Sequence, residues 1–157
     1  MSKNVKRVAR VLEEAGIGAD IVEMPDSTRT AAEAAAAVGC TLDQIAKSII
    51  FRAEAHGTAV LFITAGGNRV DAEKASALAG EPLGKADASL IRAQTGFVIG
   101  GVAPVGHLNP IRAWFDPRLL AFGTVWAAAG TPRHVFAIPP DALLRLSGAV
   151  EADFTAA

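Results

Sequence analysis

The sequence has little of what disulfide-stabilised, membrane-spanning or secreted proteins need. Its single cysteine, Cys40, cannot form an internal disulfide, which suits a reducing compartment. No apolar run approaches the roughly 18 residues of a membrane helix, so no membrane partner is expected. The first residues, Met1 to Arg7, lead into a charged helix pattern and do not resemble a signal peptide. We therefore expect a cytoplasmic protein.

An excess of charge of one sign is also missing. Lysine and arginine total 15, and aspartate and glutamate total 16, which gives a net charge of -1 with histidine neutral. Proteins that coat nucleic acid through bulk electrostatics need many cations facing the phosphates. Any contact with nucleic acid must therefore be local, and DNA is not expected as a partner.

Motifs for nucleotide cofactors and for metal ions are absent from the sequence. It contains neither Gly-x-Gly-x-x-Gly nor a Gly-Lys-Ser/Thr phosphate loop. The three histidines, His56, His107 and His134, are far apart, and none has metal-ligand spacing with a second histidine, cysteine or carboxylate. We therefore predict that the protein uses no cofactor and no metal.

The sequence does contain enough apolar residues for a core. Its 157 residues are 51% hydrophobic, and we expect a single domain over residues 1–157. Capping-box spacing from Thr30 to Glu33 predicts an alanine-rich helix that ends at Gly39. Hairpin-linked strands with irregularly interspersed helices favour a mixed α+β fold. The predicted helices cover residues 3–15, 30–39, 71–79, 87–94 and 141–146, with short turns of helix after Thr41 and Asp116, and the predicted strands cover residues 19–24, 46–52, 58–64, 97–101, 112–115, 124–128 and 134–138.

Lys47 is an unusual cation in an apolar strand. Strand alternation places Lys47, Ile49 and Phe51 on one face, and Ser48 and Ile50 on the other. Lys47 either extends to water at the start of the strand or stands at the mouth of a pocket, where it would hold an anionic or carbonyl oxygen. Because Ser48 points to the opposite face, we reject a Ser-Lys nucleophile pair.

A glycine-proline loop covers residues 100–106 and follows the strand predicted at 97–101. Its glycines let backbone N–H groups approach a ligand closely, so the loop can serve as an oxyanion or carbonyl site. A tight turn that needs positive φ explains the same residues equally well. His107, directly after the loop, is a candidate contact for a ligand or a water molecule.

Three segments carry a resemblance to a known family. They are residues 47–51 (Lys-Ser-Ile-Ile-Phe), 100–107 (Gly-Gly-Val-Ala-Pro-Val-Gly-His) and 128–133 (Ala-Ala-Gly-Thr-Pro-Arg). In this order, and with residues 27–30 and 67–71, they resemble the YbaK-type and ProX-type prolyl-tRNA editing proteins, over about Val5 to Glu151. The resemblance implies a free-standing counterpart of the editing domain of bacterial prolyl-tRNA synthetases, with a barrel-like mixed sheet and surrounding helices.

The resemblance also implies an activity, a deacylase that hydrolyses the ester joining a small wrong amino acid to tRNA(Pro), without metal or nucleotide. Lys47 would hold the terminal phosphate or the substrate carbonyl region. Gly100, Gly101 and Pro104 would position the aminoacyl group and its attacking water, completing the catalytic set. The expected partners are the 3′ aminoacyl end of the tRNA and a prolyl-tRNA synthetase. The expected substrate-binding residues are Arg29, Thr30, Arg69, Gly106, His107, Gly130 and Thr131.

Double-sieve editing gives this activity a physical rationale. A missing methylene changes binding by only about 1–3 kcal/mol, so a synthetase that accepts proline needs a second site that hydrolyses smaller products. Cysteine, alanine, serine and threonine all remain candidate substrates, and hydrolysis by water or by the substrate's own thiol stays open. The small Ala127 to Ala129 stretch would favour a small side chain. The alternatives are a non-catalytic RNA-binding or synthetase-associated module of the same fold, and a small-molecule hydrolase or binding protein.

Overall fold

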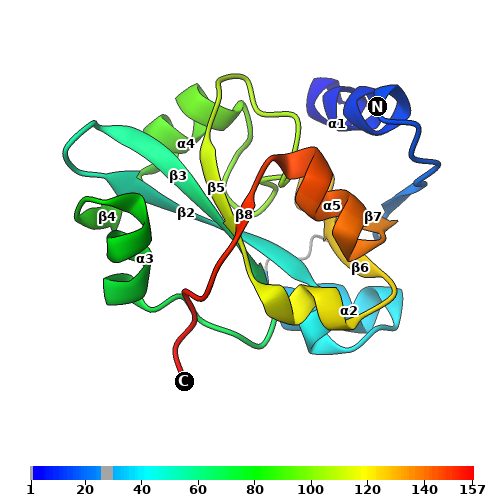
Figure 1. The fold of residues 1–157 in the computed structure, drawn as a ribbon. Helices are drawn as coiled ribbons and strands as arrows, with labels where there is room; N and C mark the ends of the chain where they lie inside the picture. The colour runs from blue at the N-terminus through cyan, green and yellow to red at the C-terminus, as the bar shows by residue number, and fades with distance from the viewer. Residues whose placement is uncertain (1, 26–29) are drawn as a thin grey trace.

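The computed structural model describes residues 2–25 and 30–157, which form two β-sheets with helices packed around them (Figure 1). One sheet has the strand order β4-β2-β3-β5-β8, and the other has the order β1-β7-β6. The strands are β1 (Ile21–Glu23), β2 (Ala46–Ala53), β3 (Thr58–Ala65), β4 (Leu83–Lys85), β5 (Arg112–Phe115), β6 (Val125–Ala128), β7 (His134–Ile138) and β8 (Val150–Glu151). The helices are α1 (Lys3–Glu14), α2 (Ala31–Val38), α3 (Ala72–Ala79), α4 (Ala88–Thr95) and α5 (Pro140–Ser147), with the 3₁₀ helices η1 (Leu42–Gln44) and η2 (Pro117–Ala121).

Helix ends follow the signals in the sequence. The Thr30 hydroxyl accepts a hydrogen bond from the Glu33 N–H, and the Glu33 carboxylate accepts one from the Thr30 N–H, both at 3.1 Å. Gly39 ends α2 in the left-handed conformation, and Asp71 and Asp87 cap α3 and α4. The predicted mixed α+β fold is confirmed. None of the helices within the described ranges is long and apolar enough to cross a membrane.

The β2-β3 hairpin forms the centre of the larger sheet. The two strands pair antiparallel from Ala46 opposite Ala65 to Ala53 opposite Thr58. β3 also pairs with β5, in parallel, so it lies inside the sheet, and its residues after Thr58 are all buried. The hairpin predicted from the sequence is therefore confirmed, and β2 lies on the outer side of it.

The two faces of the hairpin enter different apolar clusters. Leu61 and Ile63 belong to a large cluster with residues of α1, α5, β6 and β7, whereas Phe62 packs on the other face with residues of α3. Phe62 stacks on Trp114 with ring centroids 4.9 Å apart. Strand alternation therefore places Lys47 on the Phe62 face and Ser48 on the Leu61 face, as expected from the sequence.

The strand predicted at residues 97–101 is wrong, because this segment is a loop. Phe97 is buried while Ile99 is 62% exposed, and the Gly101 N–H donates to the Val98 carbonyl to close a turn. Gly96 and Gly100 both have positive φ, which interrupts an extended run. Apolar composition alone therefore misassigned a segment that glycines turn back on itself.

The barrel-like sheet implied by the resemblance is also wrong, because the larger sheet does not close. β4 and β8 terminate it, and among the described residues an isolated parallel bridge joins Ile45 to Trp126 of the smaller sheet. The sequence interpretation missed β4 and β8, which are three and two residues long. Such short strands carry too few residues for an alternation signal.

Candidate active site at the outer edge of β2

A cavity of about 920 Å³ lies along the outer edge of β2. β4 pairs with β2 at Phe51 to Ala53, and β6 approaches it at Ile45, so the cavity occupies the stretch between these contacts. Its volume is near the upper end of the range for small-molecule sites, about 300–1,000 Å³. The lining includes Thr30, Lys47, Ser48, Ile50, Gly66, Ala86, Ile99, Gly100, Val102, Trp126, Ala127 and Ala128.

Lys47 reaches the cavity from the Phe62 face of β2. Its Nζ donates one hydrogen bond to the Gly66 carbonyl oxygen at 3.3 Å. A Cβ on Gly66 would collide with the Leu42 carbonyl oxygen, so glycine is needed for this close approach. The ammonium has three N–H donors, and the other two make no hydrogen bond with the part of the chain that the structure describes, so they are left for an oxygen of a ligand.

The charge of Lys47 is set by opposing influences. Burial lowers the pKa of its ammonium, Arg69 lowers it further, and the carboxylates of Asp116 and Asp43 raise it. Asp116 is itself only 2% exposed and accepts hydrogen bonds from the Ala65 N–H and the Asn68 side chain, at 3.0 and 2.8 Å. Lys47 is thus a partly desolvated cation held near a fixed carboxylate.

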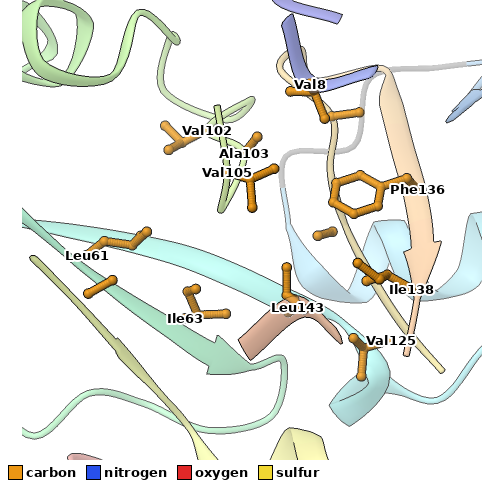
Figure 2. Close-up of a cluster of buried hydrophobic side chains, with 14 of the residues drawn as sticks. Val8, Leu61, Ile63, Val102, Ala103, Val105, Val125, Phe136, Ile138 and Leu143 are labelled. Carbon is orange, nitrogen blue, oxygen red and sulfur yellow. The ribbon is translucent and has the colours of Figure 1, made fainter. Parts of the chain in front are cut away.

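The glycine-proline loop approaches the cavity from the opposite face of the sheet. Figure 2 shows the side chains of Val102, Ala103 and Val105 among those of Val8, Leu61 and Phe136. Gly100 and Val102 line the cavity, whereas Gly101 and Pro104 are buried behind them and are not part of the lining. The loop is therefore anchored in the core, with its first residues exposed to the cavity.

The loop also packs tightly against a second glycine loop. A Cβ on Gly101 would lie 2.7 Å from the Thr131 Cα, closer than real Cβ contacts. Gly130, beside Thr131, has φ near 100° and approaches the backbone of Asn4. The Thr131 hydroxyl shares a hydrogen bond of 2.6 Å with His134. The structure thus brings Gly101, Gly130 and Thr131 together, and none of the three is part of the cavity lining.

Arg7 of α1 holds the loop, a role that the sequence did not indicate. Its Nε donates to the Gly106 carbonyl oxygen at 2.6 Å, and one Nη donates to the Thr95 carbonyl oxygen at 3.2 Å. The guanidinium carbon also lies 4.5 Å from the centre of the Phe97 ring. Because Arg7 falls on the polar side of an amphipathic helix, helical periodicity alone indicates a solvent-facing residue.

His107 lies outside the cavity lining. Its Nε2 donates to the Ala103 carbonyl oxygen at 2.8 Å, and its ring packs edge-on against Phe97. Burial lowers the pKa of this imidazole, the Ala103 carbonyl raises it, and the Arg7 cation lowers it. His107 therefore braces the loop internally in this structure.

The remaining predicted site residues are spread out. Thr30 lines the cavity and also caps α2, so the start of this helix lies at the site. Arg69 lines a separate, smaller hollow with Ala156 and Ala157. Arg29 lies outside the described residues. Within residues 2–25 and 30–157, no group of three histidine, cysteine or acidic side chains could hold a metal ion.

Comparison with known proteins places this geometry in a family. Residues 25–146 match the family model of the aminoacyl-tRNA editing domain. The chain belongs to this family. The resemblance read from the three sequence segments is thereby confirmed at the level of the family.

Two solved structures and one curated protein are similar to this chain over most of its length. A protein described as "a putative trans-editing enzyme for prolyl tRNA synthetase" is 48% identical, with a TM-score of 0.92 and coverage of 100% of this chain and 99% of that one. Hypothetical protein APE2540 is 30% identical, with a TM-score of 0.87 over 96% of this chain and 99% of its own. The uncharacterized protein YwhH of Bacillus subtilis (strain 168) is 31% identical over 82% of this chain and 81% of its own.

Proposed function

We propose that this editing domain is a trans-editing deacylase that hydrolyses the ester of a small non-cognate amino acid on tRNA(Pro). The observation that carries the proposal is one cavity reached by Lys47 from one face of the sheet and by the glycine loop from the other. Family membership supplies the substrate class, an aminoacyl-tRNA. The similarity to the protein described as a trans-editing enzyme "for prolyl tRNA synthetase" favours tRNA(Pro).

The reaction needs positioning and charge stabilisation more than a strong nucleophile. A water oxygen attacks the ester carbonyl carbon, and the tetrahedral intermediate carries its negative charge on the former carbonyl oxygen. The C–O bond to the ribose then breaks, and the proton from water passes to the ribose oxygen. Lys47 holds the terminal phosphate or carbonyl region, and the loop at Gly100 orients the ester and its water.

The cavity walls support selection for a small side chain. Ala127 and Ala128 line it, and its polar rim at Lys47 is opposite apolar residues such as Val102. The cavity is also large enough for a nucleoside next to the amino acid. A few cations and stacking contacts are sufficient to recognise an unpaired tRNA end. We propose that a prolyl-tRNA synthetase supplies further tRNA selectivity.

A deacylation panel tests the proposal. The purified protein is incubated with tRNA(Pro) charged separately with cysteine, alanine, serine, threonine and, as the cognate control, proline. We expect rapid release of at least one small amino acid, with prolyl-tRNA(Pro) spared and with inhibition by uncharged tRNA. Failure to release any of the four would overturn the deacylase proposal and favour the non-catalytic module. Hydrolysis that uncharged tRNA does not inhibit would instead indicate a small-molecule hydrolase.

A further inference from the structure

Two hydrogen bonds of the sheet show which residues of β2 direct their backbone N–H and C=O groups toward the cavity. The Asp116 N–H donates to the Ile63 carbonyl oxygen, so Ile63 directs its backbone groups away from β2. The Glu54 N–H donates to the Pro82 carbonyl oxygen, so Glu54 directs its N–H toward β4. Residues two apart on a strand share the same direction. Both bonds therefore assign the backbone groups of Ser48 and Ile50 to the outer edge of β2.

This edge is open where the cavity lies. Within residues 2–25 and 30–157, β4 pairs with β2 only at Phe51 to Ala53, and the bridge to β6 lies at Ile45. The gap from Ala46 to Ile50 is about 13 Å long at 3.3 Å per residue. An unpaired strand edge of this kind presents donors and acceptors to any extended group. Flanked at both ends, the gap suits a short ligand better than a long peptide strand.

The Ser48 side chain adds an unsatisfied polar group beside the open edge. Its Oγ is buried, and no hydrogen-bond partner for it occurs among the described residues. Buried hydroxyl groups are nearly always hydrogen-bonded, because leaving one unpaired costs free energy. Ser48 thus has a backbone edge facing the cavity and a hydroxyl without a partner, both next to the Leu61 face where Ala127 and the glycine loop lie.

We propose that the open edge at Ser48 binds the aminoacyl group in the manner of one residue of a paired strand. The free α-ammonium donates to the Ser48 carbonyl oxygen, and the ester carbonyl oxygen accepts from the Ser48 N–H. In a hydrogen-bonded antiparallel pair, opposite side chains lie on the same face. The amino acid side chain then lies beside Ser48, on the face that Ala127 and Val102 line.

This arrangement deepens the proposed function, on which it rests. The Ser48 N–H would donate to the oxygen on which negative charge develops, supplying one oxyanion contact from the backbone. Lys47 acts from the other face of the same strand and stays free for the terminal phosphate. An N-acylated substrate keeps an N–H donor but loses the charge that strengthens its hydrogen bond to the Ser48 carbonyl oxygen, so the proposed site requires the positive charge of a free α-ammonium group.

N-acetylation of the substrate tests this requirement. The fastest substrate of the panel is compared with its N-acetyl form, on wild-type protein. Acetylation leaves one N–H donor but removes the positive charge and adds bulk between β4 and β6, so we expect kcat/KM to fall by about tenfold or more. Hydrolysis of the N-acetyl ester within about twofold of the free ester would overturn the inference while leaving the deacylase proposal intact. Inactivity toward both forms would count against the deacylase itself.

A proline substitution tests the edge directly. Ser48→Pro deletes an N–H that faces the gap, and proline is tolerated on the open edge of a strand. Ser48→Ala is the reference, because it removes the same hydroxyl and keeps the N–H. We expect Ser48→Pro to fold, with kcat/KM about tenfold or more below that of Ser48→Ala.

A neighbouring substitution checks the assignment of the edge. Ile49→Pro deletes an N–H that faces β3, and we expect this variant to lose the folded state in a thermal unfolding experiment. Equal kcat/KM for Ser48→Pro and Ser48→Ala would overturn the inference. Unfolding of Ser48→Pro to the same extent as Ile49→Pro would contradict the edge assignment itself.

Discussion

Burial and the nearby Asp116 carboxylate shift the pKa of Lys47 in opposite directions. The balance between them sets the pH at which this ammonium loses its charge. Burial lowers the pKa of its ammonium, and the nearby Asp116 carboxylate partly restores it. Strand alternation correctly predicted its face and its separation from the Ser48 side chain. The Gly66 carbonyl that holds its Nζ comes from the next loop, and alternation within one strand contains no information about that contact.

The pH dependence of deacylation tests the charge of Lys47. Because its pKa is lowered, the ammonium loses its proton at a lower pH than a solvent-exposed lysine. We expect kcat/KM, corrected for spontaneous ester hydrolysis, to fall as the pH rises through this lowered pKa. A guanidinium stays charged in this range, so Lys47→Arg should lose the alkaline fall in whatever activity remains. The same alkaline fall in Lys47→Arg would contradict this assignment.

His107 predicts a pH effect on stability. Its pKa in the folded protein is lowered by burial, so the unfolded chain binds a proton more readily. The free energy of unfolding should therefore decrease as the pH falls below about 6.5, the ordinary histidine value. Urea unfolding from pH 7.5 to 5.5 measures this slope, with His107→Gln as the reference that cannot titrate. Equal slopes in both proteins would show that His107 does not contribute.

At the scale of elements, two glycine loops pack against each other. Gly101 packs on Thr131, and Arg7 of α1 binds the Thr95 carbonyl before the glycine-proline loop and the Gly106 carbonyl at its end. The order of the sequence motifs predicted that both loops belong to the functional site. The sequence also indicated a strand before the glycine-proline loop, and that prediction was wrong. Their mutual contact joins segments about thirty residues apart, which periodicity over a short window does not reveal.

An alanine at Gly101 tests the contact between the loops. The added Cβ would overlap the backbone of Thr131, and the φ of Gly101 is one that alanine adopts without strain. We expect Gly101→Ala to lower the free energy of unfolding by about 1–3 kcal/mol through overpacking, and to slow deacylation because the loop shifts. Gly123→Ala is the matched control, since nothing lies within 4 Å of its added Cβ. Equal denaturation midpoints for the two variants would contradict the packing argument.

At the scale of the whole molecule, the site forms where two sheets approach but do not merge. β4 and β6 flank a stretch of β2 whose outer edge has no partner strand among the described residues, and Thr30 contributes from the start of α2. Family resemblance predicted Lys47, Gly100 and Thr30, and all three line one cavity. The open edge depends on β4 being only three residues long, a feature without a sequence signal, so the role of Ser48 could not be predicted.

The net charge of -1 predicts how tRNA binding responds to salt. A small number of phosphate contacts makes tRNA binding depend only weakly on salt concentration. Each contact with a single strand contributes about -0.7 to the slope of log binding constant against log salt concentration. We expect a slope between about -1 and -3 for catalytically inactive complexes, measured by filter binding from 50 to 200 mM salt. A slope steeper than about -5 would indicate a broad basic interface that the composition does not support.

We propose that the ester is hydrolysed in the cavity that Lys47 and the glycine loop share. Single-turnover deacylation of the fastest panel substrate, compared between wild type and Lys47→Ala, tests it most directly. We expect Lys47→Ala to fold with an unchanged circular dichroism spectrum and to lose about a hundredfold or more in rate, because the tRNA end is no longer positioned for attack on the ester. A Lys47→Ala protein that deacylates at the wild-type rate would contradict it.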